Sequence, residues 1–363
     1  MRFPEFTEPW ERRKLSEFAT KITKKNRDNT ISNVLSNSAT LGIVQQSQYF
    51  EREIVTDENL NGYYVINKDD FVYNPRKSVS APCGPVNKYD GKESGIISPL
   101  YLCFTVNNIN RSFLLWFFKS PKWYRYIYLN GDSGVRHDRV SIKDDLFLDM
   151  PITIPLSAEQ EKISKLFELI DRRIAVQSGL IEKLESLIGG IIERLTAQYP
   201  NVRIADCLEC HSSTLQENQL NETGGYRVYG ANGICGYTDS PGINGDAILI
   251  VKDGSGVGNV SYAIGEYSVI GTSNYLTAKN GYSLRYLYYI LKKFNFAPYK
   301  TGMAIPHIYF KDYGRAMVYC PSFEEQERIA KKLSKIERKI EIERSIKDCC
   351  IAQKQYLLQQ MFI

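Results

Sequence analysis

The chain has 363 residues, of which 43% are hydrophobic and 24% charged, a composition typical of soluble globular proteins with room for two ordinary domains. It contains 46 Lys+Arg against 41 Asp+Glu, and the net charge of +5 permits a nucleic-acid partner without requiring one. No stretch approaches the roughly 18 apolar residues of a membrane-spanning helix, and the N-terminus lacks the apolar core of a secretory signal, so we expect a cytoplasmic protein with mostly reduced cysteines.

Residues 1–154 form the first globular segment of the predicted organisation, and basic residues gather in three places along it. The stretch RSFLLWFFKSPKWYRYI at 111–127 predicts a helix in which one basic group is interleaved with aromatic side chains. Basic residues among aromatics suit contact with phosphates, although a solvated face over an aromatic core gives the same pattern. The three groups are Lys21, Lys24, Lys25 and Arg27; Arg111, Lys119, Lys122 and Arg125; and Arg136, His137 and Arg139.

The next segment, residues 155–196, has the pattern of a long coiled-coil helix. Pro155 prevents a helix from continuing in from upstream, and Ser157 with Gln160 matches the S-x-x-Q capping box. The apolar residues that follow recur at alternating steps of four and three, and only Gln177 interrupts this coiled-coil period. The predicted seam consists of Ile163, Phe167, Ile170, Ile174, Ile181, Leu184, Ile188, Ile191 and Leu195.

Residues 197–320 form a second globular segment that corresponds to the first. Its runs NGDAILIVK at 244–252 and SYAIGEYSVIG at 261–271 predict strands, and SLRYLYYILKKF at 283–294 predicts a helix placed as in the first segment. Three shorter matches support the correspondence: RKLSEF (13–18) with VRIADC (202–207), VSIKD (140–144) with IYFKD (308–312), and FLDMPITIP (147–155) with GRAMVYCP (314–321).

The last segment, residues 321–363, repeats the long helix. PSFEEQERI at 321–329 begins 166 residues after PLSAEQEKI at 155–163. Lys347 and Lys354 replace apolar seam residues in the middle of this copy. Apolar side chains available to compensate there are Ile346, Cys350 and Tyr356. The predicted second seam consists of Ile329, Leu333, Ile336, Ile340, Leu357 and Met361.

This internal repeat predicts the architecture of the chain. Two copies of one unit pack most simply about a twofold axis, which makes the two helices antiparallel, each roughly 60 Å long at 1.5 Å per residue. The expected fold class is α+β, with two similar mixed domains separated by two long antiparallel coiled-coil helices. The alternative is two unrelated domains that end in similar helices, and the matched helix starts at fixed spacing argue against it.

No constellation of catalytic residues or metal ligands emerges from the sequence. The chain has only three histidines, a poor supply for metal binding or nucleophilic catalysis. CLECH at 207–211 fits a haem-attachment pattern, but such attachment belongs outside the cytosol and the first copy of the repeat lacks the motif. KDGSGVGN at 252–259 is followed by a predicted strand rather than the helix that a phosphate-binding turn needs, so a hairpin or surface loop is expected.

The paired phrases PLSAEQEKISKLFELIDRRI and PSFEEQERIAKKLSKIERKI resemble the two conserved helical regions of the specificity subunit of type I restriction–modification enzymes. EPWERRKLSEF resembles the usual opening of the first target recognition domain of that family, and GMAIPHIYFKD resembles the loop and strand that precede the helix. The resemblance spans the whole chain and implies target recognition domains at 1–154 and 197–320, with helical regions at 155–196 and 321–363.

The resemblance implies a non-catalytic DNA-recognition subunit without a cofactor or metal of its own. In that family each recognition domain reads one half of a split DNA target in the major groove, while the helices set the gap and dock two modification subunits. S-adenosylmethionine is then expected on the modification subunit, which methylates adenine, and ATP and Mg on an optional motor–nuclease restriction subunit. The alternatives are an enzyme that acts alone and a coiled-coil adaptor without a DNA role; salt-dependent DNA binding excludes the adaptor.

Candidate DNA contacts are the polar and basic residues in loops of the two globular segments. Arg suits guanine, Asn suits adenine, and Lys often binds phosphate. In the first segment we predict contacts from Arg76, Lys77, Ser78, Lys88, Arg136, His137 and Arg139. In the second segment we predict contacts from Lys252, Asp253, Ser255, Asn274, Lys300 and His307.

Overall fold

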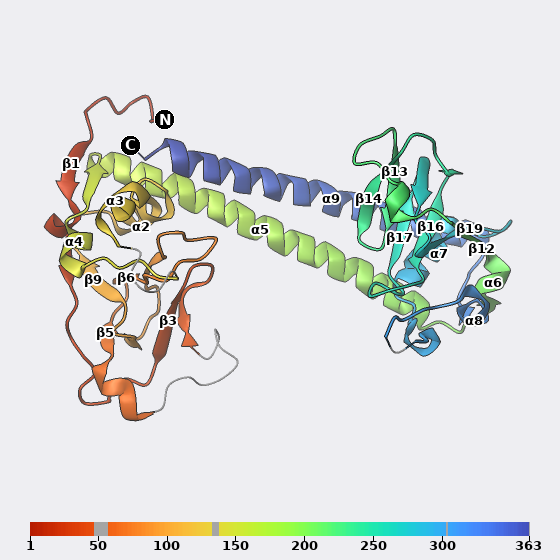
Figure 1. Ribbon diagram of the computed structural model, residues 1–363, viewed down its shortest axis with the longest axis horizontal. Coiled ribbons are helices and arrows are strands. Elements are labelled where there is room, and N and C mark those ends of the chain that lie inside the picture. Colours follow the sequence, from red (N-terminus) through yellow and green to blue (C-terminus); the bar gives the residue numbers. More distant parts are fainter. Residues whose placement is uncertain (47–56, 133–137, 303, 363) are drawn as a thin grey trace. The chain divides into compact units, whose positions relative to one another are not determined.

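The computed structural model describes residues 1–46, 57–132, 138–302 and 304–362. The chain forms two compact units: unit 1 holds Met1–Val176 and Lys347–Ile363, and unit 2 holds Gln177–Ile346. Each unit therefore contains one mixed domain together with parts of two long helices (Figure 1). Within the described residues, no helix is long and apolar enough to cross a membrane.

The described residues of unit 1 form two four-stranded sheets and a two-stranded ribbon. Its strands are β1 (Glu11–Lys14), β2 (Ala19–Lys21), β3 (Val34–Ser38), β4 (Gly42–Gln45), β5 (Tyr64–Ile66), β6 (Phe71–Tyr73), β7 (Val86–Lys88), β8 (Gly95–Ile97), β9 (Leu102–Val106) and β10 (Pro151–Ile154). The sheets have the orders β2-β9-β6-β7 and β4-β3-β8-β5, with β3 and β8 parallel, and the ribbon pairs β1 with β10.

Unit 2 repeats this topology strand for strand. Its strands are β11 (Val202–Arg203), β12 (Leu208–Ser212), β13 (Tyr226–Gly230), β14 (Gly233–Thr238), β15 (Ile243–Asn244), β16 (Ala247–Val251), β17 (Val260–Ala263), β18 (Glu266–Val269), β19 (Ser273–Ala278) and β20 (Met317–Val318). The orders are β12-β19-β16-β17 and β14-β13-β18-β15, with β13 and β18 parallel, and β11 pairs with β20. The internal repeat predicted from the sequence is therefore confirmed.

Short helices also occur in both units, and two pairs of them occupy matching places. Unit 1 has α2 (Arg111–Lys119), α3 (Tyr124–Asn130) and α4 (Asp144–Leu148), and unit 2 has α6 (Ile204–Cys207), α7 (Leu284–Lys292) and α8 (Phe310–Tyr313). Short 3-10 helices lie at Leu15–Glu17, Asp57–Gly62, Glu217–Gln219 and Ala297–Tyr299. In position α7 corresponds to α2, and α8 to α4. The aromatic stretch at 283–294 forms α7 as predicted, whereas the stretch at 111–127 forms two helices, α2 and α3, because Pro121 cannot continue a helix.

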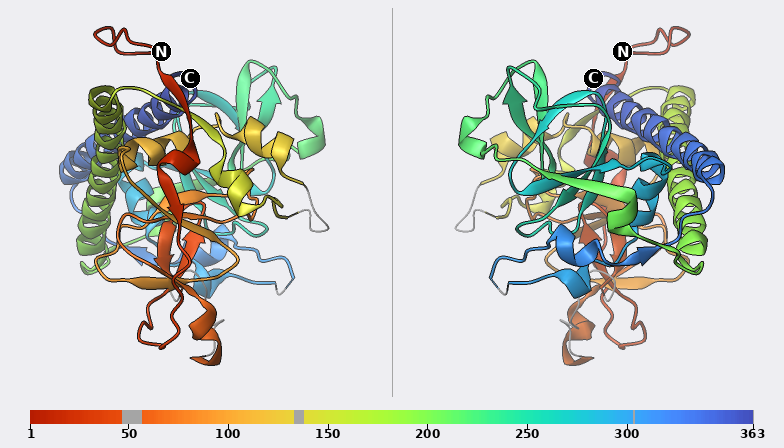
Figure 2. Two further views of the ribbon diagram at one scale, coloured as in Figure 1. Left: turned by 90° about the vertical axis from the view of Figure 1, so that its left-hand side faces the viewer. Right: turned by 90° about the vertical axis from the view of Figure 1, so that its right-hand side faces the viewer.

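The two long helices are α5 (Ser157–Thr196) and α9 (Phe323–Gln360), drawn in green and blue in Figure 2. In unit 1, Phe167 stacks on Phe362, while Asp171 pairs with Lys354. Residue numbers rise along α5 as they fall along α9, so the helices are antiparallel there. In unit 2, Gln177 of α5 bonds to Glu343 of α9, and these residues are 166 apart and hence equivalent in the repeat.

The predicted seam positions are buried or half-buried along both helices. Two details differ from the sequence prediction. Ile192, rather than its predicted neighbour Ile191, is the more deeply buried residue, because a straight α-helix drifts relative to a strict 3.5-residue period. Tyr356 is 54% exposed and does not fill the seam, because its position turns it outward, whereas Cys350 is buried.

Each mixed domain shares its core with the ends of both long helices. In unit 1, the Trp116 ring of α2 stacks on Phe167 of α5 at 5.1 Å. Phe362 lies 5.4 Å from Phe113, so the end of α9 closes the same aromatic core. The N-terminal ammonium of Met1 donates to the carbonyl of Gln360 at 2.6 Å, which places both chain ends in unit 1 (Figure 1).

Candidate nucleic-acid interface

The repeated glutamine at the start of each long helix anchors that helix to its own domain. The Gln160 carboxamide donates to the carbonyl of Pro155 (2.8 Å) and accepts from the backbone N–H of Asn110 (3.0 Å). Gln326 makes the same two bonds, to Pro321 (2.8 Å) and from Ser283 (2.9 Å). Asn110 and Ser283 are the N-cap residues of α2 and α7, so the long helix and the domain helix start from a common point.

The capping box predicted for Ser157 and Gln160 is wrong. Ser157 is already the first residue of α5, one position beyond a cap. The Gln160 side chain reaches Asn110 rather than returning to the backbone of the cap residue. The Gln160 carboxamide, which a capping box would use locally, makes a tertiary contact instead. The spacing of Ser157 and Gln160 in the sequence does not distinguish these two arrangements.

Two loops of unit 1 meet beside the end of β6. Pro75 and Lys77 follow β6, and Asp138 and Val140 precede α4. The backbone N–H of Lys77 donates to the carbonyl of Asp138 at 2.8 Å, and that of Val140 donates to Pro75 at 2.9 Å. We call these segments the first loop pair. Predicted DNA contacts more than sixty residues apart in the sequence are thereby brought together.

The side chains of the first loop pair are mainly cationic. Arg76 and Arg139 are β-bridge partners, and the Arg76 Nε lies 3.9 Å from the Asp138 carboxylate. The side chains of Arg76 and Asp138 are both more than half exposed. Asn74 was not predicted from the sequence; its buried carboxamide accepts from the N–H of Arg76 (3.0 Å) and donates to the carbonyl of Asn37 (3.0 Å). The Asn-Pro pair at 74–75 was the available signal, since this dipeptide favours a turn.

Unit 2 has a second loop pair, formed by the loop after β16 and the loop before α8. The N–H of Gly254 donates to the carbonyl of Pro306 at 3.0 Å, and that of Ile308 donates to Lys252 at 2.9 Å. These bonds match those of the first loop pair one for one. The match agrees with the predicted alignment of VSIKD with IYFKD. The segment KDGSGVGN, which contains Lys252 and Gly254, is a connection between the antiparallel strands β16 and β17, as predicted.

The matched hydrogen bonds make Asp253 the counterpart of Arg76 and His307 the counterpart of Arg139. Asp253 and His307 are again β-bridge partners, and the His307 Nδ1 lies 2.7 Å from a carboxylate oxygen of Asp253. About a third of each side chain is exposed. One place in the fold therefore carries two guanidinium groups in unit 1 and a carboxylate–imidazole pair in unit 2. The two loop pairs present different hydrogen-bonding groups to a ligand.

The remaining predicted contacts lie in several settings. Ser78 and Ser255 are exposed on the loops after β6 and β16, and Lys300 is exposed next to the bridge of Thr301 with His307. Lys88 lies in β7 with its ammonium bound by Asp69 at 2.8 Å and by Asp90. Asn274 is buried in β19 and accepts from Ser212 at 2.9 Å. Arg136 and His137 lie outside the described residues.

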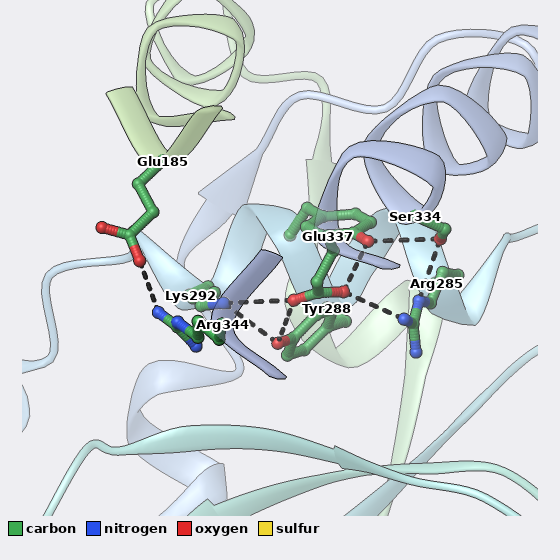
Figure 3. A network of polar contacts seen from close by, with 8 residues as sticks. Glu185, Arg285, Tyr288, Lys292, Ser334, Glu337 and Arg344 are labelled. Atoms are coloured by element: carbon green, nitrogen blue, oxygen red, sulfur yellow. Dashed lines mark hydrogen bonds and ion pairs between the residues drawn. The ribbon is translucent and has the colours of Figure 1, made fainter. Parts of the chain in front are cut away.

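A polar network fixes α7 against α9 in unit 2 (Figure 3). The Glu337 carboxylate accepts from the Tyr289 hydroxyl at 2.8 Å and from Arg285 at 3.0 Å, and Lys292 lies 3.4 Å away. Burial raises the pKa of Tyr289 to about 12, so its hydroxyl stays protonated and donates. The equivalent residue in unit 1, Asp171, pairs with Lys354 of the other long helix instead. The network therefore stabilises the packing of the second domain on α9.

The Cys and His side chains of CLECH at 207–211 make contacts within their own domain. Cys207 is fully buried, and His211 hydrogen-bonds the Thr277 hydroxyl at 2.9 Å and stacks on Tyr275. Burial among apolar neighbours keeps the pKa of the Cys210 thiol raised, to about 11. Among the described residues, no group of three or more His, Cys, Asp or Glu side chains is arranged to hold a metal ion.

Comparison with known proteins decides the family. Residues 7–186 and 198–349 match the family model described as the type I restriction modification DNA specificity domain. The chain belongs to this family. The two matches fall on the two halves of the repeat, one on each loop pair, and as a specificity subunit the chain has DNA recognition as its role.

Solved structures share the fold of this specificity subunit. The type I restriction–modification S subunit from M. genitalium is 16% identical, with a TM-score of 0.65 over 99% of this chain and 97% of that chain. A chain from a study of complex assembly and conformational transition of the type I R-M system is 15% identical, with a TM-score of 0.56 over 98% and 97%. No curated protein sequence matches the chain.

Proposed function

We propose that this specificity subunit reads a DNA target in two separated halves, one half by each loop pair. The main observation behind this proposal is that matching backbone hydrogen bonds join the two loops of each pair, while the side chains at the equivalent positions differ. A symmetric target read by identical loops would not need such a difference. Distinct side chains at equivalent places suit two unlike half-sequences, since Arg pairs with guanine and Asp accepts from cytosine or adenine amino groups.

The long helices then fix the distance between the two half-sequences and dock two modification subunits. S-adenosylmethionine binds to those partner subunits, which methylate adenine, and ATP and Mg bind to a restriction subunit where one joins. The specificity subunit itself supplies recognition and no catalytic group, and the complex works in the cytoplasm. A rigid spacer between two DNA-reading elements makes the separation of half-sites a geometric quantity.

The test uses the chain purified in complex with its modification subunits. The complex is incubated with genomic DNA and S-adenosylmethionine, and methylated adenines are mapped by sequencing. We expect one target of two unlike half-sequences separated by unspecified base pairs. A continuous target without a gap contradicts the two-part proposal, and a complex without sequence preference contradicts the recognition role.

A further inference from the structure

A fully exposed aliphatic side chain lies in the described part of the first loop pair. Val79, 103% exposed, stands at the tip of the turn between Ser78 and Ala81. Reciprocal backbone bonds of 3.1 and 3.2 Å join these two residues, and the Ala81 N–H also lies 3.1 Å from the Ser78 hydroxyl. The turn therefore holds Val79 outward in a fixed position, and little backbone freedom remains to be lost when a ligand binds.

The second loop pair also carries an exposed aliphatic side chain. Ile305 is 60% exposed and lies in the loop that Thr301 and His307 close with backbone bonds of 2.9 and 2.7 Å. Gly302 has a φ of +87°, and a Cβ there would lie 2.4 Å from the carbonyl oxygen of Ile305. Only glycine fits this close approach, which brings the backbone of Ile305 against Gly302 and near His307.

Single exposed aliphatic residues are ordinary on protein surfaces, but these two lie among the groups that we propose read DNA. Arg, Asp and His side chains recognise hydrogen-bond donors and acceptors on base edges. An aliphatic side chain beside them cannot take part in this hydrogen bonding. The apolar feature of the major groove is the C5 methyl of thymine, which aliphatic side chains contact. We propose that Val79 and Ile305 each bind a thymine methyl group, one in each half of the target.

This inference rests on the proposed function and adds a specific base to it. Each half-sequence, on one strand or the other, must contain an adenine–thymine pair under the aliphatic residue. Removing one methyl from the contact should weaken binding about fourfold, the size expected when one methyl-sized apolar group is left out of an interface. The effect belongs to one position in each half and not to the target as a whole.

The test replaces thymine with deoxyuridine, one position at a time, in an oligonucleotide carrying the mapped target. Deoxyuridine keeps every hydrogen-bonding group and removes only the methyl. The dissociation constant of the complex with its modification subunits is measured for each oligonucleotide. We expect one position in each half at which deoxyuridine weakens binding about fourfold.

Variants assign each position to its residue. With Val79→Ser the deoxyuridine effect should vanish in one half only, and with Ile305→Ser in the other half only. Val79→Ile, which keeps an aliphatic contact, should retain the effect. Ile264→Ser is the matched control, because Ile264 is 67% exposed in the turn after β17. Its neighbour Ala263 pairs with Ala247, at the end of β16 away from the second loop pair.

The outcomes separate this inference from the proposed function. If the complex methylates a gapped target but deoxyuridine has no effect at any position, the proposed function stands and the thymine contacts are wrong. A target with a half made only of guanine–cytosine pairs overturns the contact in that half. An effect that persists unchanged in Val79→Ser and Ile305→Ser assigns the methyl to other residues and overturns the inference.

Discussion

At the scale of single residues, the two loop pairs have different side chains at positions where their backbone hydrogen bonds are the same. The bridge of Arg76 with Arg139 and the bridge of Asp253 with His307 have the same backbone bonds, so side-chain identity is the variable that remains. All four residues were predicted one by one from the sequence as DNA contacts. Their pairing could not be predicted, because the bonds that join the loops are made by backbone atoms, which leave no residue-specific signal.

The Asp253→Asn variant tests the second loop pair. The carboxylate holds the His307 ring through a 2.7 Å contact, and an amide weakens this hold because it lacks the charge. We expect discrimination in one half-sequence to fall by about tenfold while the other half is unaffected, since one base contact is worth about 1–3 kcal/mol. Methylation of target libraries measures this. Asp246→Asn, which alters a carboxylate bound by Tyr262, should leave both halves unchanged.

Lys88 is predicted to contribute to stability through Asp69. The hydrogen bond from Lys88 holds the pKa of Asp69 below its ordinary value of 3.8. A lowered carboxyl pKa stabilises the folded state above that ordinary value, and this stabilisation is lost as the pH falls through the folded-state pKa. Lys88→Met should therefore reduce the free energy of unfolding by about 1 kcal/mol at neutral pH, a typical size for a partly exposed ion pair.

Urea unfolding at several pH values checks this expectation. The difference between wild type and Lys88→Met should shrink as the pH falls below about 4, where the Asp69 carboxyl binds a proton first in the unfolded chain and, at lower pH, in the folded protein. Lys92→Met, at an exposed lysine on the loop after β7, should behave like wild type throughout. A Lys88→Met difference that stays constant down to low pH would show that the pair contributes through packing rather than through charge.

At the scale of elements, hydrophobic periodicity predicted most of what the structure contains. The alternating steps of four and three located α5 and α9 to within a few residues, and the aromatic stretches located α2 and α7. Sheet order was not predictable, because pairing of β6 with β9 joins strands that are distant in the chain. The capping box failed for a related reason: the Gln160 side chain is used by a residue fifty positions away.

The glutamine anchors give a prediction at this scale. Gln160→Leu leaves the Asn110 N–H and the Pro155 carbonyl without their partner, which should cost about 1–3 kcal/mol per unsatisfied buried group. Gln326→Leu should do the same at Ser283. We expect hydrogen exchange to accelerate in unit 1 for the first variant and in unit 2 for the second. Equal acceleration in both units by either variant would contradict local anchoring.

At the scale of the whole molecule, the chain is an internal repeat of one mixed domain followed by one long helix. The modest net charge and the lack of a catalytic motif gave no function by themselves, whereas the paired helix starts predicted both the architecture and the family. The DNA half-sequences could not be predicted from the amino-acid sequence, because they depend on the conformations of loops that have little sequence similarity to each other. The repeat-equivalent contact of Gln177 with Glu343 is the natural place to lengthen both helices together.

The most direct test of the account inserts one heptad after Gln177 and one after Glu343, so that the added turns face each other. Seven residues add about 10 Å, close to three base pairs of DNA. Methylated adenines are then mapped for wild-type and lengthened complexes. The account predicts the same two half-sequences with a gap longer by about three base pairs. Altered half-sequences, or an unchanged gap in an active complex, would contradict it.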